Sequence, residues 1–352
     1  MSAAIFVPAH IRELRSYRPA ARTRIQLDAN ECSWPLPEEV RRRFAEVAAG
    51  IDYHRYPDAT AAQLRAGLAA RFGGSSDEYV VGNGSDELIV LLLQAIGARD
   101  TPVLIPFPTF VMYEHNARTL GRRTARVPLT DRLELDIDAT AAALRELSPA
   151  LLFLATPNNP TGHAVAPADV ARLAAAHRST LLVVDEAYGA YSDTDYRSLS
   201  DEPNVGFMGT RSKAGLAGIR CGYARLPGTL AEEVDKVRQP FNLDSFTMQV
   251  ATLALTDLRA VFDRHAEEVA AARADLHREL DAVDWIAPYP SSANFILCKL
   301  QRPSEEIWRA LRERGIGIKN LAAYGPVLEN HVRITVGTPD ENGELITALR
   351  EL

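Results

Sequence analysis

Residues 151–188 read LLFLATPNNPTGHAVAPADVARLAAAHRSTLLVVDEAY, and this stretch carries the pattern that decides the fold. Two short apolar runs, 151–155 and 181–184, flank a proline- and asparagine-rich turn and a helical stretch over 167–176. A continuous apolar run of this length is typical of a strand that is buried on both faces. The stretch therefore predicts two parallel strands connected by a helix.

The same alternation extends on both sides of this stretch. Short apolar runs predict further strands over residues 103–105, 205–208 and 221–224. Helical patterns predict helices over residues 86–96, 110–120, 139–147 and 230–238. Strands and helices that alternate in this way indicate an α/β fold, with a mainly parallel sheet covered by helices on both faces.

The sequence pattern changes after residue 242. Apolar side chains recur there at steps of three or four and predict one long amphipathic helix, with the stripe Leu258, Phe262, His265, Val269, Ala272, Leu276, Leu280 and Val283. Because His265 lies on this stripe, we expect a packed core histidine rather than a ligand. A smaller α+β unit should follow, with elements over 294–300, 304–314, 332–336 and from residue 340 onward.

We therefore expect three parts in the chain. Residues 1–35 would form an N-terminal arm that packs on the small domain or on a partner subunit, because the first thirty-odd residues are punctuated by prolines. Residues 36–255 would form the large domain and residues 256–352 the small one. No internal repeat or low-complexity segment interrupts this division.

Composition excludes several classes of protein. The 352 residues are 47% hydrophobic and 24% charged, which is ordinary for a globular protein. A net charge of -7 disfavours a nucleic-acid binder, and no apolar run approaches the roughly 20 residues that span a membrane. The start lacks a secretory pattern, and three distant cysteines predict neither disulfides nor a metal pair. The cytoplasm is the expected location.

Lysine is rare in this sequence. Only four of the 39 basic residues are lysines (Lys213, Lys236, Lys299 and Lys319), so the other 35 are arginines. Lysine can lose its proton and act as a nucleophile, whereas arginine cannot. A lysine within a loop of small residues is therefore a candidate for chemistry.

Four polar or glycine-rich segments follow expected strands, where open α/β sheets bind their ligands. The first, GNGSDE (82–87), precedes an apolar helix. Glycine allows close backbone approach, and a helix start presents free N–H groups to an anion, so we expect a phosphate site there. The structural alternative is that Ser85 or Asp86 is only a helix N-cap. A third glycine, as in a dinucleotide fingerprint, is missing.

The second and third segments, TPNNPTG (156–162) and VDEAY (184–188), follow the two strands quoted first. Two asparagines between prolines form a rigid polar turn, which either serves only as a turn or aims an amide at a fixed point. A carboxylate directly after a buried strand must be paired to remain charged. The acidic pair also resembles a Walker B strand, but the sequence has no GxxxxGK[ST] loop, which disfavours a nucleotide hydrolase.

The fourth segment, GTRSKAGLAGIR (209–220), places Lys213 between Ser212 and Arg220. Serine and arginine are natural phosphate ligands. A lysine beside other cations loses its proton more readily and becomes a nucleophile. An exposed basic loop would not require four small residues around one rare lysine. We therefore expect covalent chemistry at Lys213.

Together these segments resemble the fold-type I aminotransferases, and most closely the histidinol-phosphate aminotransferase branch of the class-II aminotransferases. The matching motifs run in the family's order: LDANE (27–31), HRYPD (54–58), GNGSDE (82–87), PTFVMY (108–113), TPNNPTG (156–162), VDEAY (184–188), SKAGLAGIRCGY (212–223), SSANFIL (291–297) and RITVGTPDEN (333–342). The resemblance implies a mainly parallel seven-stranded sheet, a smaller α+β domain and the cofactor pyridoxal 5'-phosphate, without a metal.

The resemblance also implies catalytic roles. Lys213 would be the Schiff-base lysine and the acid and base that moves the substrate's proton. Asp185 would keep the pyridine nitrogen of the cofactor protonated. Asn159 and Tyr188 would hydrogen-bond the ring oxygen, and Phe110 would stack on the ring.

Further implied contacts concern the phosphate, the substrate and a second subunit. The implied phosphate ligands are the backbone amides of Ser85 and Asp86 and the side chains of Ser212 and Arg220. The implied substrate ligands are Asn30, Arg333 and Lys319. Tyr56 would reach the phosphate site of a partner subunit, so a homodimer with shared active sites is expected.

Several positions depart from the family pattern. The stretch 213–220 is one residue shorter than the common SKAFGLAGLR form. Arg211 stands where the family usually has an apolar residue, and Phe110 replaces a usual tyrosine, which keeps the stacking ring but removes a hydroxyl. Lys319 lies near the place of a second substrate-binding arginine, so a bidentate contact would become a point charge.

The leading hypothesis is transamination between L-histidinol phosphate and 2-oxoglutarate, giving imidazole-acetol phosphate and L-glutamate in histidine biosynthesis. An aromatic-amino-acid aminotransferase and a phosphothreonine decarboxylase are alternatives with the same cofactor. A catalytically inactive, regulatory protein is disfavoured because the lysine, aspartate, asparagine and tyrosine are all present. The missing glycine loops disfavour a P-loop or nicotinamide-dependent enzyme.

Overall fold

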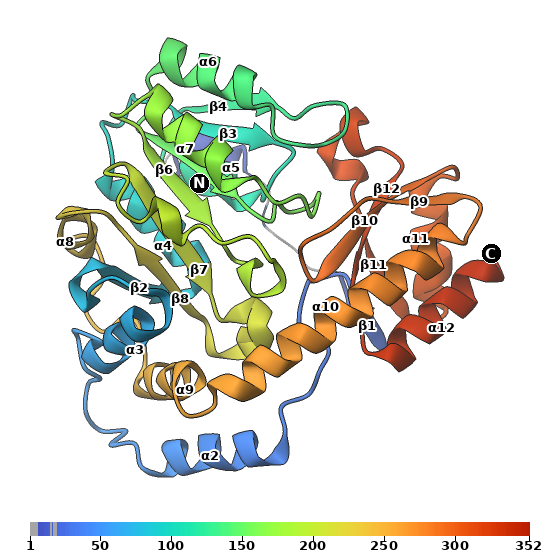
Figure 1. The fold of residues 1–352 in the computed structure, drawn as a ribbon, viewed down its shortest axis with the longest axis horizontal. Helices are drawn as coiled ribbons and strands as arrows, with labels where there is room; N and C mark the ends of the chain where they lie inside the picture. The colour runs from blue at the N-terminus through green and yellow to red at the C-terminus, as the bar shows by residue number, and fades with distance from the viewer. Residues whose placement is uncertain (1–5, 15, 17–19) are drawn as a thin grey trace.

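The computed structural model describes residues 6–14, 16 and 20–352, and their strands form two separate sheets (Figure 1). The larger sheet has seven strands in the order β2-β8-β7-β6-β5-β3-β4. Its strands are β2 (Tyr79–Asn83), β3 (Val103–Phe107), β4 (Thr124–Pro128), β5 (Leu151–Ala155), β6 (Leu181–Asp185), β7 (Val205–Thr210) and β8 (Cys221–Arg225). Only β8 runs antiparallel to its neighbours, so the predicted mainly parallel sheet is confirmed.

Helices cover both faces of this sheet. One face packs against α4 (Gly84–Ala95), α5 (Met112–Thr119) and α8 (Leu230–Asp235). The opposite face packs against α6 (Ile137–Leu147) and α7 (Pro167–Ala176), and near β2 and β8 against α3 (Ala62–Phe72) and α9 (Ser245–Leu255). Every residue of β5 and β6 is buried, which is why their sequences are apolar throughout.

Most predicted elements of the large sheet are confirmed, and β5 and α7 have the predicted bounds. Several helix bounds were wrong: α4 and α6 each begin two residues earlier than predicted, and α5 and α8 also differ. Helix α5 begins at Met112 rather than at residue 110, because Phe110 belongs to the turn that precedes it. Helix α8 ends at Asp235 rather than at the predicted Arg238. Residues 237 and 238 form turns in which each amide bonds the carbonyl three residues before it. The strands β2 and β4, at the two edges of the sheet, were not predicted. The side chains of β4 are mostly exposed or half-buried and give no apolar run.

The second sheet has five strands in the order β1-β11-β12-β10-β9. They are β1 (Ile25–Leu27), β9 (Ile286–Pro288), β10 (Phe295–Leu300), β11 (Ile316–Asn320) and β12 (His331–Thr335). Strand β1 pairs in parallel with β11, and this pairing brings residues 28–30 to the side of the large sheet. Residues 25–27 of the N-terminal segment therefore belong to the second sheet.

A long helix connects the two sheets (Figure 1). Helix α10 (Arg259–Asp281) buries most of the predicted stripe, and with α11 (Ser304–Glu313) and α12 (Pro339–Arg350) it forms the core of the smaller unit. His265 is buried in α10, as predicted for a packed residue. No helix among the described residues is long and apolar enough to cross a membrane.

The carboxyl ends of β2, β3, β5, β6 and β7 meet at one edge of the large sheet, because these strands are all parallel. Glycine permits a close approach there. Gly84 has a φ of +76° at the turn from β2 into α4. On β8, a Cβ added to Gly222 would lie 2.4 Å from the carbonyl carbon of Gly84 and 2.5 Å from the amide nitrogen of Ser85.

We expect Gly222→Ala to lower the free energy of unfolding by about 1–3 kcal/mol, because the added methyl group must push the turn at Gly84 away from β8. Thermal or denaturant unfolding measures this. The control is Gly343→Ala on α12, where an added Cβ meets nothing within 4 Å, and it should be neutral or slightly stabilising. Equal stability of the two variants would contradict a close contact at Gly222.

Candidate active site

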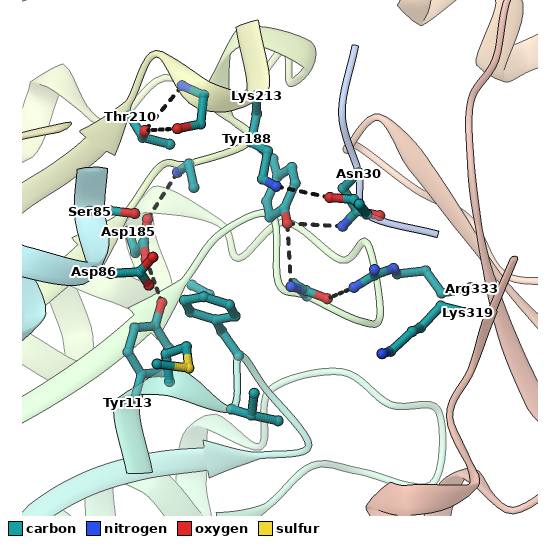
Figure 2. Close-up of a pocket in the computed structure, with 18 of the residues that line it drawn as sticks. Asn30, Ser85, Asp86, Tyr113, Asp185, Tyr188, Thr210, Lys213, Lys319 and Arg333 are labelled. Carbon is teal, nitrogen blue, oxygen red and sulfur yellow. Dashed lines mark hydrogen bonds between the residues drawn. The ribbon is translucent and has the colours of Figure 1, made fainter. Parts of the chain in front are cut away.

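A cavity of about 380 Å³ lies at the carboxyl edge of the large sheet, between the two sheets (Figure 2). The ends of β5, β6 and β7 form one side of it, and β11 and β12 of the second sheet form another. It gathers twelve residues predicted from the sequence: Asn30, Ser85, Asp86, Phe110, Asn159, Asp185, Tyr188, Ser212, Lys213, Arg220, Lys319 and Arg333.

Tyr56 is the predicted site residue that lies elsewhere. It is 82% exposed and stacks on Phe241 with 4.6 Å between ring centroids. Its expected place beside a partner subunit's phosphate site stays a prediction.

Lys213 follows the end of β7 in a kinked turn over Ser212–Leu216, in which Ala214 and Gly215 depart from helical geometry. The hydroxyl of Tyr191 donates a hydrogen bond to the Lys213 carbonyl and so fixes the lysine's backbone. The Lys213 ammonium donates to the carbonyl oxygen of Ala29 at 3.1 Å. Burial, and next the positive charge of Arg333, lowers the pKa of Lys213 to about 8. Lys213 therefore has a substantial neutral, nucleophilic fraction near neutral pH.

Asp185 is the last residue of β6, and its carboxylate is buried. The hydroxyl of Tyr113 donates to Oδ2 at 2.6 Å, and the amide of Ala187 donates to Oδ1 at 3.0 Å. Burial raises the pKa of Asp185 to about 6, although both hydrogen bonds act in the opposite direction. Among the described residues this carboxylate has no ion pair. Because a buried carboxylate needs a positive partner, the cavity beside Asp185 suits a cationic group.

A chain of hydrogen bonds crosses the cavity from one sheet to the other. The side-chain amides of Asn30 and Asn159 donate to the Tyr188 hydroxyl at 2.9 and 3.3 Å. Arg333 donates at 2.6 Å to the Asn159 oxygen and at 2.6 Å to the carbonyl of Asp28. Figure 2 shows Asn30, Tyr188 and Arg333 directed toward one another within this network.

The proline-bounded turn divides its two asparagines between two tasks. Asn158 donates to the carbonyl of Pro108 at 3.1 Å and accepts from Thr109 at 2.6 Å, so it holds the neighbouring loop. Asn159 instead lines the cavity. The two roles expected for this turn therefore fall to different residues. Asn158 has the structural role, and Asn159 presents its amide to the cavity.

An anion-binding end of the cavity forms where β2 turns into α4. Ser85 and Asp86 lie in the first turn of α4, and neither acts as its N-cap, because the helix has Asn83 at that position and no side-chain cap. The Arg220 guanidinium donates to the Ser212 hydroxyl at 3.1 Å and lies 3.5 Å from an Asp86 oxygen. The other Asp86 oxygen is buried and has no partner among the residues that the structure describes. Free helix-start amides beside a guanidinium and a hydroxyl suit a phosphate.

The structure adds Tyr113 and Thr210, to which the sequence assigned no role. Tyr113 bonds Asp185 and stacks on Phe153 with 4.8 Å between ring centroids. Thr210 donates to the Ser212 hydroxyl at 3.0 Å and orients it. Tyr113 lies within the quoted motif PTFVMY, one helical turn after Phe110, and this spacing was the only sequence signal for it.

Two cations lie side by side on the second sheet. Lys319 on β11 and Arg333 on β12 are directly opposite each other in the antiparallel pair, and both line the cavity. Burial, and next the charge of Arg333, lowers the pKa of Lys319. The Nε of Arg333 is buried, and no described residue accepts a hydrogen bond from it. Two adjacent cations repel each other, so this wall suits an anionic group.

Known proteins are similar to this chain in both sequence and fold. Residues 22–349 match the family model described as aminotransferase class I and II. Histidinol-phosphate aminotransferase of Chromobacterium violaceum is 41% identical over 328 residues, with 93% of this chain and 91% of that relative covered. The Aquifex aeolicus protein of the same name is 34% identical over 351 residues, with 98% of this chain and 97% of the relative covered.

A solved structure extends this similarity to three dimensions. The histidinol-phosphate aminotransferase from Sinorhizobium meliloti, in complex with pyridoxal-5'-phosphate, superposes with a TM-score of 0.88 at 27% sequence identity. The match covers 99% of this chain and 98% of that one. The predicted fold-type I architecture is therefore confirmed. The chain belongs to the family of class I and II aminotransferases.

Proposed function

We propose that this protein uses pyridoxal 5'-phosphate to transfer the amino group of L-histidinol phosphate to 2-oxoglutarate, a step of histidine biosynthesis. The names of full-length relatives at 34–41% identity support the reaction. The pyridoxal-5'-phosphate in the Sinorhizobium meliloti structure supports the cofactor. An amino donor and a 2-oxo acid would be the two substrates.

One observation carries the proposal. Asp185 is a buried carboxylate without a cation, and it faces the same cavity as Lys213, whose pKa burial lowers to about 8. Such a carboxylate stabilises a protonated ring nitrogen, and a lysine of lowered pKa supplies a nucleophilic amine. A pyridine aldehyde presents both complementary groups in one molecule. The donors of the cavity thus fit this cofactor.

The remaining cavity residues would hold the cofactor in place. Ser85, Asp86, Ser212 and Arg220 would surround its phosphate at the start of α4. Phe110 would lie on its ring, while Asn159 and Tyr188 would bond its ring oxygen. When bound, the cofactor supplies an electron sink that weakens the bonds at the amino-bearing carbon.

Lys213 would act as the acid and base, moving the proton between the substrate's amino-bearing carbon and the cofactor-side carbon. Its amine can do so because burial favours the neutral form, and Tyr191 holds its backbone. Asp185 would stabilise positive charge at the ring nitrogen throughout. Tyr113 would keep the Asp185 carboxylate charged and oriented through its 2.6 Å hydrogen bond.

The paired cations support a phosphorylated amino donor. Arg333 and Lys319 face the cavity from adjacent strands, and a phosphate offers charge and acceptor atoms for both. Asn30 would contact the substrate from the N-terminal segment. The same cations would bind the carboxylates of 2-oxoglutarate when this second substrate enters the cavity.

The active unit in this proposal is a homodimer in the cytoplasm. Tyr56 and Phe241 form an exposed aromatic pair that would complete a partner's phosphate site. Residues 36–255 would form the cofactor-binding domain and 256–352 the small domain, with the arm 1–35 joining the small domain through β1.

Lys213→Arg should abolish covalent attachment of pyridoxal 5'-phosphate, because arginine remains protonated. In the unmodified chain the attachment rate should rise with pH through about 8, because the neutral amine is the nucleophile and its fraction grows as pH passes the pKa of Lys213. Stopped-flow absorbance gives the rate, and borohydride reduction with peptide mass spectrometry gives the site. Lys236→Arg, at an exposed lysine, is the matched control and should change neither. An attachment rate that does not change between pH 6 and 9 would contradict the assignment of Lys213 as the nucleophile.

Tyr113→Phe should lower kcat/KM by about tenfold or more, because a hydrogen bond to a buried carboxylate contributes roughly 1.5–3 kcal/mol. The hydroxyl lowers the pKa of Asp185, so removing it should raise that pKa and move the acidic limb of the pH–rate profile to higher pH. Tyr79→Phe loses a 2.7 Å bond to the Gly73 carbonyl outside the cavity and serves as the control. An identical acidic limb in Tyr113→Phe would refute the positioning role.

L-histidinol phosphate should be the best amino donor among histidinol phosphate, phenylalanine and phosphothreonine. Lys319→Gln should lower kcat/KM for histidinol phosphate by about tenfold through KM, because a charge-assisted contact to the phosphate is lost. Unphosphorylated L-histidinol should show little change in the same variant. Turnover of phenylalanine alone would instead indicate an aromatic aminotransferase, and CO₂ release from phosphothreonine a decarboxylase.

A further inference from the structure

A second cavity, of about 360 Å³, adjoins the active-site cavity. We call it the Arg211 cavity and define it by Arg211, Tyr223, Glu186, Phe262 and a set of alanines from three segments. Ala187 and Thr210 line both cavities, so only the backbone around the ends of β6 and β7 separates them. The mechanism above uses none of the residues that define this cavity.

Arg211 presents an unusual charge to this cavity. The side chain is only 9% exposed, yet its guanidinium makes no hydrogen bond or ion pair with any residue that the structure describes, and its Nε is buried. The nearest compensation is the face of Phe262, 5.6 Å from the guanidinium carbon to the ring centroid. A buried, unpaired charge is strongly destabilising unless a counter-ion or hydrogen-bond acceptor meets it.

A second buried arginine, Arg122, shows which hydrogen-bond acceptors Arg211 lacks. Arg122, 6% exposed, donates to the carbonyls of Leu93, Ile96 and Thr101 at 2.6, 2.7 and 3.1 Å. The two terminal nitrogens of that guanidinium thus find acceptors in the backbone of the fold, and its Nε lacks a partner among the described residues, as that of Arg211 does. Arg211 receives no such acceptor from the residues that the structure describes, and it lines the cavity, so we look for its acceptor in a ligand from outside the chain.

The walls indicate the kind of acceptor. Apolar groups form much of the lining: Phe72, Phe262, Ala187, Ala190, Ala214 and Ala270. The Tyr223 hydroxyl and the Glu186 carboxyl have no hydrogen-bond partner among the described residues, and neither do the exposed carboxylates of Asp193 and Glu267. Burial, and next the charge of Asp185, raises the pKa of Glu186 to about 7, so its protonated form can donate a hydrogen bond near neutral pH.

The acidic residues around the cavity restrict the charge of the ligand. Asp263 pairs with Arg71 at 2.8 Å and so neutralises that cation, while Asp193 and Glu267 are exposed. Arg211 therefore remains as one uncompensated cation among carboxylates. This balance favours a single negative charge over the double charge of a phosphate.

We propose that the Arg211 cavity binds a small monocarboxylic acid with an apolar body, whose carboxylate pairs with Arg211 and whose body lies against Phe262 and the alanines. This site is distinct from the substrate wall formed by Lys319 and Arg333. A ligand there contacts Tyr191 and Ala214, which hold and follow Lys213. The apolar residue that the family usually has at position 211 would not form it.

The probe for this proposal is 4-bromobenzoate, a monocarboxylate with an aromatic body and an anomalous scatterer. Crystals of the cofactor-loaded protein soaked in it should show a bromine peak inside the Arg211 cavity, with the carboxylate within hydrogen-bond distance of Arg211. A peak only beside Arg333, or no peak at all, would overturn the proposal.

Affinity in solution, measured by calorimetry with the cofactor-loaded protein, gives the second test. Arg211→Met should weaken binding of 4-bromobenzoate by about tenfold or more, because the charge-assisted hydrogen bonds are lost. Arg264→Met, at an exposed arginine on α10, is the matched control and should bind as the unmodified chain does. Should Arg211→Met fail to fold, Ala270→Phe fills the cavity while keeping the charge and should also abolish binding. Unchanged affinity in a folded Arg211→Met or Ala270→Phe variant would contradict the site.

Discussion

The arrangement of this protein depends on one buried carboxylate. Asp185 ends a central strand whose every residue is buried, so its charge lies where water cannot solvate it. Tyr113 and the Ala187 amide stabilise it only in part, and its pKa stays raised. A cationic partner has to enter from the cavity. The strands on either side end at the same edge, so the groups that receive such a partner gather around Asp185.

The same cavity also joins the two sheets. Arg333 reaches from the second sheet to Asn159 on the large one, and Asn30 reaches from the N-terminal segment to Tyr188. These bonds make the position of each substrate-facing group depend on the other sheet. Movement of the second sheet would therefore change contacts to the substrate and to Tyr188 together. Binding and chemistry share one hydrogen-bond network.

Two adjoining cavities contain buried charges of opposite sign. Asp185 faces the active-site cavity and has no cationic partner among the described residues. Arg211 faces the Arg211 cavity and has no anionic partner among them. Ala187 and Thr210 line both cavities. The two charges do not neutralise each other, because the backbone around Ala187 and Thr210 separates the cavities that they face. Each charge instead selects a ligand of opposite sign, and this difference in sign is the physical basis for treating the cavities as two sites.

The sequence by itself determined the inner strands of the large sheet, the helices α4 to α8 and most residues at the carboxyl edge. Apolar runs and steps of three or four report burial within a single element, which is why β5, α7 and the stripe of α10 were predicted correctly. Twelve of the thirteen predicted site residues line one cavity. Those of the large sheet meet because parallel strand ends share an edge, whereas Asn30, Lys319 and Arg333 come from the side of the second sheet. The edge strand β4, which has no continuous apolar run, left no such signal.

Only the tertiary structure decided which of these groups touch. The Tyr113–Asp185 bond joins residues 72 positions apart, and the Arg333–Asn159 bond joins residues 174 positions apart. The isolation of Arg211 is likewise invisible in its neighbours along the chain, since it depends on where β8 and α10 pack. Periodicity describes one element at a time, whereas contacts depend on how separate elements pack, and packing is a property of the whole chain.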